Sequence, residues 1–138
     1  MRTILLDTNA YASFLGGDKN VLEALGSAEI VYLSIVVLGE LYAGFLGGSR
    51  IKDNKKILHN FLKKPTVQIL NATAETSEIF GMLKDSLKKA GTPLPINDVW
   101  IAAHAFETGS VVITYDHHFT KVSGLRLWES LEIQVDRL

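Results

Sequence analysis

The sequence predicts an α/β protein, a three-layer α/β/α sandwich with a mostly parallel central sheet. Along the 138 residues, short apolar runs of strand length alternate with longer segments in which apolar residues recur at helical spacing. Parallel strands need a long crossover connection, usually a helix, so this alternation indicates a parallel sheet covered by helices. The chain is 47% hydrophobic, which is enough for a substantial core.

The first strand is expected at Thr3–Leu6, an apolar run that leads directly into Asp7. A short helix follows and stops at Gly16-Gly17, and a second short helix takes residues 18–25. The second strand is expected at Ile30–Ser34.

Glu40 stands out in the helix that follows the second strand. This helix begins near Ile35 or Val36 and is closed by Gly47-Gly48. Glu40 is its only charged residue, and a carboxylate on such an apolar face is costly to bury without a partner. A bound cation or a distant Arg would supply one, and the sequence leaves both open.

The segment from Arg50 to Lys64 is the one basic block of the chain and is expected to be an amphipathic helix. Its charges form either a solvated face or a surface that contacts a phosphate backbone, and the sequence favours neither. The candidates for such contacts are Arg50, Lys52, Lys55 and Lys56. Because this helix follows the Glu40 helix, it could border the same edge of the sheet.

The second half of the chain contains a helix–strand unit with an acid at each end. After a strand at 67–70 and a helix at 74–89, a Gly- and Pro-rich break leads into a helix with Asp98 in its first turn. The strand that follows, at 111–114, ends in Tyr115-Asp116. A fifth strand is expected at residues 125–128.

The chain shows no repeat, linker or low-complexity segment, so residues 1–138 are expected to form a single domain. The tail from Glu129 to Leu138 receives no assignment. There is no cysteine, the opening apolar run is too short for a secretory signal, and no apolar run approaches a membrane span. These features predict a cytoplasmic protein. The net charge of −1 does not by itself indicate a nucleic-acid binder.

Four carboxylates are expected to meet at one edge of the sheet. Asp7 and Asp116 follow strand ends, and Asp98 begins a helix. Glu40 lies about 6–8 Å from its helix start, and its side chain tilts back toward that start. Taken singly, the three Asp residues are better explained as caps of helices or turns. Together they occupy the edge at which open parallel sheets bind ligands.

Converging carboxylates repel each other unless cations lie between them. Mg²⁺ and Mn²⁺ take oxygen ligands and remove this repulsion. Ions held in this way polarise phosphate groups and activate water. The cluster therefore predicts metal-dependent attack on a phosphodiester.

Four motifs carry a family resemblance. They are Asp7-Thr8-Asn9, the lone Glu40 in its apolar helix, Asn97-Asp98 ahead of Ile101-Ala102-Ala103, and Thr114-Tyr115-Asp116-His117-His118-Phe119. In this order and spacing, the chain resembles the PIN-domain ribonucleases over nearly its whole length. It is most similar to the VapC-type toxins of bacterial and archaeal toxin–antitoxin pairs.

The resemblance implies an endoribonuclease whose first three acids bind Mg²⁺ or Mn²⁺. It places Asp116 at the family's fourth and more variable acidic position. Thr114 and Asn9 match positions that support the acidic cluster. The resemblance also implies an RNA substrate, a small cognate antitoxin that blocks the acidic site, and a homodimer.

Two other functions are compatible with parts of the pattern. A haloacid-dehalogenase-like phosphatase also has an Asp after its first strand, but that family has a second Asp where this chain has Asn9. A PIN-like module that binds RNA or a partner without turnover is the non-enzymatic alternative. The complete set of acids argues against it.

The remaining histidines and aromatic residues are expected to be structural. Adjacent side chains in a turn rarely face the same ligand, so His117 and His118 are interpreted mainly as structural, with a minor chance that one touches substrate. His59 and His104 are interpreted as surface or packing residues. Core positions are expected for Tyr42, Trp100 and Trp128.

Overall fold

The structure is a computed structural model that describes residues 2–128. Its four strands form one parallel sheet in the order β3-β2-β1-β4. The strands are β1 (Thr3–Leu6), β2 (Ile30–Ser34), β3 (Val67–Leu70) and β4 (Val111–Ile113). The predicted α/β fold with a parallel central sheet is confirmed.

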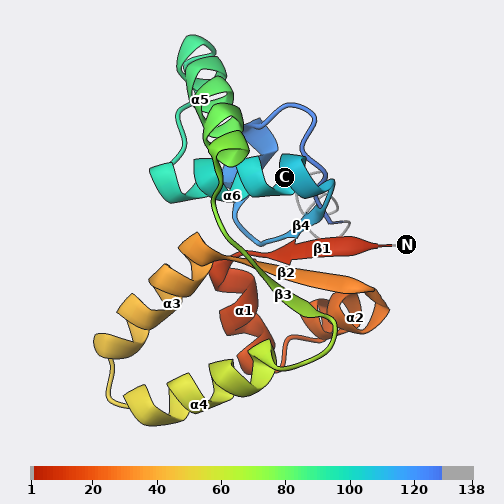
Figure 1. Ribbon diagram of the computed structural model, residues 1–138, viewed down its shortest axis with the longest axis vertical. Helices are drawn as coiled ribbons and strands as arrows, with labels where there is room; N and C mark the ends of the chain where they lie inside the picture. Colours follow the sequence, from red (N-terminus) through yellow and green to blue (C-terminus); the bar gives the residue numbers. More distant parts are fainter. Residues whose placement is uncertain (1, 129–138) are drawn as a thin grey trace.

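Helices cover both faces of the sheet. They are α1 (Thr8–Leu15), α2 (Lys19–Ser27), α3 (Ile35–Leu46), α4 (Ile51–Leu62), α5 (Ala74–Lys89) and α6 (Ile96–Thr108), followed by the 3₁₀ helix η1 (His117–Lys121). In Figure 1 the sheet lies between α1 to α4 on one side and α5 with α6 on the other. This arrangement is the predicted three-layer sandwich.

The core extends over both faces of the sheet. In the central strand β1, Ile4, Leu5 and Leu6 are all fully buried, which explains why the run is apolar without alternation. Trp128 is buried in the core as expected, whereas Trp100 is only partly buried and stacks on Phe80 with ring centroids 4.1 Å apart. Among residues 2–128, no helix has both the length and the apolar character needed to cross a membrane.

The strand register brings three strand ends to one level. Leu6 of β1 is paired with Leu33 of β2 on one side and with Ile113 of β4 on the other. The residues that follow β1 and β4 are Asp7 and Thr114, and the backbone N–H of Asp7 donates to the carbonyl of Ile113 at 3.3 Å. This edge of the sheet therefore collects the side chains that follow the strands.

The expected fifth strand at 125–128 is wrong. This segment makes a single isolated bridge, between Leu127 and Val112, in which Val112 donates to Arg126 and accepts from Trp128. Alternate residues of a strand direct their backbone groups to opposite neighbours. In the three-residue strand β4, the backbone groups of the residues on either side of Val112 face β1. Only Val112 directs its N–H and carbonyl away from β1, so only one bridge to the segment 125–128 can form. The tail at 129–138 lies outside the described residues.

Candidate active site

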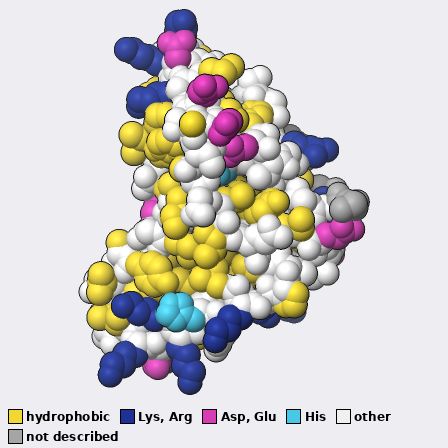
Figure 2. All heavy atoms as spheres, viewed as in Figure 1, with side chains coloured by type: hydrophobic (Ala, Val, Ile, Leu, Met, Phe, Trp, Pro, Cys, Tyr) yellow, Lys and Arg dark blue, Asp and Glu magenta, His cyan; other side chains and the backbone are white. Residues whose placement is uncertain are grey.

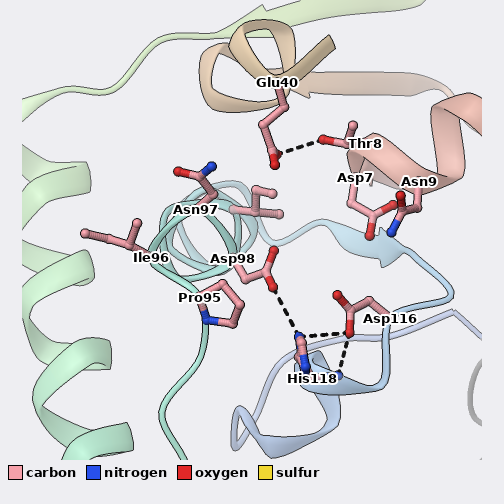
Figure 3. Close-up of a pocket in the computed structure, with 11 residues that line it drawn as sticks. Asp7, Thr8, Asn9, Glu40, Pro95, Ile96, Asn97, Asp98, Asp116 and His118 are labelled. Carbon is pink, nitrogen blue, oxygen red and sulfur yellow. Dashed lines mark hydrogen bonds and ion pairs between the residues drawn. The ribbon is translucent and has the colours of Figure 1, made fainter. Parts of the chain in front are cut away.

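A cavity of about 310 Å³ at the carboxyl ends of the strands contains all four candidate carboxylates. They reach it from different elements: the N-terminus of α1, the middle of α3, the first turn of α6 and the segment after β4 (Figure 3). The lining residues are Asp7, Thr8, Asn9, Glu40, Pro95, Ile96, Asn97, Asp98, Ile101, Asp116 and His118. The structure thus brings together acids that are far apart in the sequence.

Asp7 is the most deeply buried of the four, with 4% of its surface exposed. One carboxylate oxygen caps α1 by accepting from the backbone N–H of Ala10 at 2.8 Å, and the other accepts from the hydroxyl of Thr114. Burial raises the pKa of Asp7 to about 6 against the lowering effect of these two hydrogen bonds, and the nearby charges of Asp116 and Asp98 add to the increase. Asp7 therefore caps α1 and belongs to the acidic cluster at the same time.

Thr114 ties Asp7 to the segment that carries Asp116. Its buried hydroxyl donates to Asp7 and accepts from the backbone N–H of Asp116 at 2.9 Å. Its carbonyl accepts from the indole N–H of Trp128 at 2.6 Å. The side chain at the predicted supporting position thus fixes two of the four acids relative to each other.

Glu40 enters the cavity from α3 and is half-buried. One of its oxygens accepts from the hydroxyl of Thr8 at 2.8 Å. In the described part of the chain, no Lys or Arg forms an ion pair with Glu40. Of the two partners that the sequence left open, a distant Arg is therefore not found among these residues. Asn9, the other predicted supporting residue, lies in the same cavity wall.

Asp98 and Asp116 lie on either side of His118 (Figure 3). The ring Nδ1 of His118 is 3.1 Å from Oδ1 of Asp116 and 3.5 Å from Oδ2 of Asp98. Burial and the charge of Asp116 raise the pKa of Asp98, and the contact with His118 opposes this rise. Asp98 makes no cap, although it lies in the first turn of α6, whereas Asp116 caps η1 through the backbone N–H of His118.

The structure places His118, interpreted from the sequence as mainly structural, among the acids of the cavity. His118 lines the cavity and contacts two of the acids, whereas His117 does not line it. A side chain two residues after a cap can fold back over the capping carboxylate in a tight turn. The spacing of Asp116 and His118 just after a strand permits this contact, but it does not fix the orientation of the ring. Thr8 is a second lining residue that sequence reasoning missed.

The basic candidates lie outside the cavity. None of Arg50, Lys52, Lys55 and Lys56 lines it, and Arg50 pairs at the surface with Asp53 at 3.6 Å. Lys and Arg side chains gather at the lower end of the face in Figure 2, where α4 lies in Figure 1. Any contact that α4 makes with a phosphate backbone is therefore made away from the acids.

The residues of the cavity fit a divalent cation. They offer carboxylate oxygens, which Mg²⁺ and Mn²⁺ prefer, and no Lys or Arg lines the cavity in residues 2–128. The raised pKa of Asp7 shows that its negative charge lacks sufficient compensation from the protein. A cation would supply that compensation.

Comparison with known proteins identifies the family. The model of the PIN domain matches residues 4–125, which is most of the chain. The chain belongs to the PIN-domain family. This match confirms the predicted resemblance and leaves the haloacid-dehalogenase-like alternative without support.

Relatives of this PIN domain are VapC proteins. It is 32% identical over 87 residues to Ribonuclease VapC4 of Mycobacterium tuberculosis, covering 63% of this chain and 67% of that protein. It is 30% identical over 114 residues to Ribonuclease VapC2 of Rickettsia felis, covering 80% and 84%. The crystal structure of VapBC2 from Rickettsia felis bound to a DNA fragment from their promoter superposes with a TM-score of 0.80 and 25% identity, covering 91% and 97%.

Proposed function

We propose that this PIN domain is a metal-dependent endoribonuclease and the toxin of a toxin–antitoxin pair. The observation that carries the proposal is the meeting of four carboxylates in one cavity. The family match supports it, since the VapC relatives are named ribonucleases. The described residues contribute to a single α/β unit, and we propose that residues 1–138 function as one domain.

The proposed ligands of a Mg²⁺ or Mn²⁺ ion are Asp7, Glu40, Asp98 and Asp116. A bound ion would polarise the phosphodiester and lower the pKa of a water molecule. The protein contributes orientation: Ala10 and Thr114 fix the carboxylate of Asp7, and Thr8 fixes that of Glu40. In-line attack by water does not use the ribose 2′-hydroxyl, so the products would carry 5′-phosphate and 3′-hydroxyl ends.

The purified protein is expected to cleave RNA with Mg²⁺ or Mn²⁺ and to stop when EDTA is added, because the carboxylates then lack their ion. Gel electrophoresis of end-labelled RNA measures cleavage, and sensitivity to a 5′-phosphate-dependent exonuclease identifies the new ends. RNA that is bound but never cut would instead support the binding module without turnover. Cleavage that continues in EDTA would contradict the proposed metal dependence.

The basic face of α4 is proposed to contact the RNA backbone. Changing Lys55 and Lys56 together to Ala should weaken binding across many sequences, because phosphate contacts carry no sequence information. Losing two phosphate contacts on single-stranded RNA should reduce the slope of log affinity against log salt concentration by about 1.4 units. The matched control is the equal change of charge at Lys84 and Lys88 of α5. An unchanged affinity and slope would identify the α4 charges as a solvated face.

We further propose a cognate antitoxin and a second copy of this chain as partners. The similar crystal structure from Rickettsia felis is that of VapBC2, and an antitoxin for this chain is the corresponding proposal. Large apolar side chains are available for partners, since Ile35, Leu46 and Ile69 are 43%, 65% and 44% exposed. Figure 2 shows hydrophobic side chains spread across the middle of one face. An RNA substrate would also agree with the cytoplasmic location expected from the sequence.

A further inference from the structure

One nitrogen atom lies among the oxygen atoms of the cavity. The side chains of Asp98, Asp116 and His118 each offer one ligand atom, and the three atoms lie within 4.8 Å of one another. We infer that His118 is a direct ligand of the divalent ion and that its nitrogen makes the site favour Mn²⁺ over Mg²⁺. The inference rests on the metal site of the proposed function and adds to it a ligand and a preference.

The separations of the His118 nitrogen from the two carboxylates are close to those of neighbouring ligands around one ion. In an octahedral shell with bonds of about 2.1 Å, neighbouring ligand atoms are about 3 Å apart and opposite ones about 4.2 Å apart. Nδ1 of His118 is 3.1 Å from Asp116 Oδ1 and 3.5 Å from Asp98 Oδ2. An ion that touches both carboxylates therefore comes within bonding reach of the imidazole after only small shifts of the side chains.

The backbone keeps the imidazole at this place. The backbone N–H of His118 donates to the carboxylate of Asp116 at 2.9 Å, so the capping Asp116 and the imidazole of His118 belong to the same turn. Phe119 anchors η1 in the core with no exposed surface, and Thr114 accepts from the backbone of Asp116 at 2.9 Å. The side chain of His118 is 48% exposed, so an ion can reach it from solvent.

The nitrogen ligand distinguishes between the two candidate ions. Mg²⁺ binds oxygen almost exclusively and gives up its waters reluctantly, whereas Mn²⁺, although the weakest imidazole binder of the divalent transition series, accepts an imidazole nitrogen more readily than Mg²⁺ does. A site of carboxylates alone would bind both ions in similar ways. Replacing one oxygen by the nitrogen of His118 therefore lowers the affinity for Mg²⁺ relative to Mn²⁺. The competing role for His118 is a counter-ion that contacts the acids and leaves when the ion binds.

Binding of Mn²⁺ to the full chain, without RNA and without a polyhistidine tag, tests the inference. Pulsed electron paramagnetic resonance should detect coupling of ¹⁴N to Mn²⁺ in the wild type and lose it in His118→Ala. Calorimetry should show a loss of Mn²⁺ affinity of about 10- to 100-fold in His118→Ala, with a much smaller change for Mg²⁺. The matched control is His117→Ala, which removes the adjacent imidazole outside the cavity and should leave both measurements unchanged.

The possible outcomes separate this inference from the proposed function. Mn²⁺ bound in the wild type without nitrogen coupling would overturn the inference alone and identify His118 as a counter-ion, whereas failure to bind Mn²⁺ would overturn both the inference and the proposed metal site. Equal losses for both ions in His118→Ala would overturn the preference. If His118→Ala does not fold, the ¹⁴N coupling of the wild type still shows whether a nitrogen binds the ion, because that spectrum needs no variant. Nitrogen coupling in a protein that does not cleave RNA would support the inference and contradict the proposed function.

Discussion

Replacing Asp98 by Asn should lower the rate of RNA cleavage by at least about 100-fold. The change keeps the shape of the side chain and removes the charge that would hold the ion. Loss of a group that only orients a metal ligand typically costs about 10- to 100-fold, so loss of a ligand should cost at least as much. Asp7→Asn and Glu40→Gln should have effects of the same size. The measurement is the single-turnover rate at saturating RNA and Mn²⁺.

Asp116→Asn should have a smaller effect, because one oxygen of Asp116 already accepts the backbone N–H of His118. The control is Asp85→Asn, the same chemical change at an exposed acid of α5 that pairs with Lys89. Circular dichroism should show that all variants fold. Full activity in Asp7→Asn or Asp98→Asn would contradict the assignment of this cavity as the active site.

The second large effect is a pH dependence of the metal-free protein. In EDTA, the free energy of unfolding of the wild type should fall, relative to Asp7→Asn, as the pH rises from 4 to 7. The folded state holds the proton of Asp7 up to a pKa of about 6, whereas the unfolded chain releases it near 3.8. Between these two pH values the unfolded chain releases the proton while the folded state still holds it, so the free energy of unfolding falls as the pH rises. Above about pH 6 the folded state carries the buried charge of Asp7, and the fall is complete. At about 1.4 kcal/mol for each pKa unit, the loss approaches about 3 kcal/mol.

Urea unfolding of both proteins at a series of pH values measures this difference. The comparison cancels contributions that they share, such as those of the histidines. Millimolar Mn²⁺ should restore the wild type at pH 7 and have less effect on Asp7→Asn, since a ligand stabilises the state that binds it. Asp53→Asn, at an exposed acid outside the cavity, serves as the control. A constant difference between wild type and Asp7→Asn across the pH range would show that the protein already compensates the charge of Asp7.

Much of the site could be predicted because strand ends and charge anomalies are visible in a sequence. Asp7 and Asp116 follow apolar runs, and parallel pairing brings such positions to one edge. Glu40 was recognisable because no other charge accompanies it in its helix. These signals depend on local pattern and on the general geometry of α/β proteins.

The failures depend on contacts that no local pattern contains. His118 faces the acids because a 3₁₀ turn folds its ring back over Asp116, and the orientation of a side chain in a turn follows from the packing around it. The segment at 125–128 is apolar like a strand, but it pairs only where Val112 directs its backbone outward. The distance of the α4 charges from the cavity follows from how α4 packs on α3, which is set by tertiary contacts.

The bond between Thr114 and Asp7 also bears on when the protein becomes active during its own synthesis. The two residues are 107 positions apart, and the strand before Thr114 enters the sheet beside β1 only after most of the chain has been made. A ribosome therefore carries a nascent chain with an incomplete set of acids until the codons for Asp98 and Asp116 have been read. With the proposed ligands, the metal site would therefore be complete only near the end of translation.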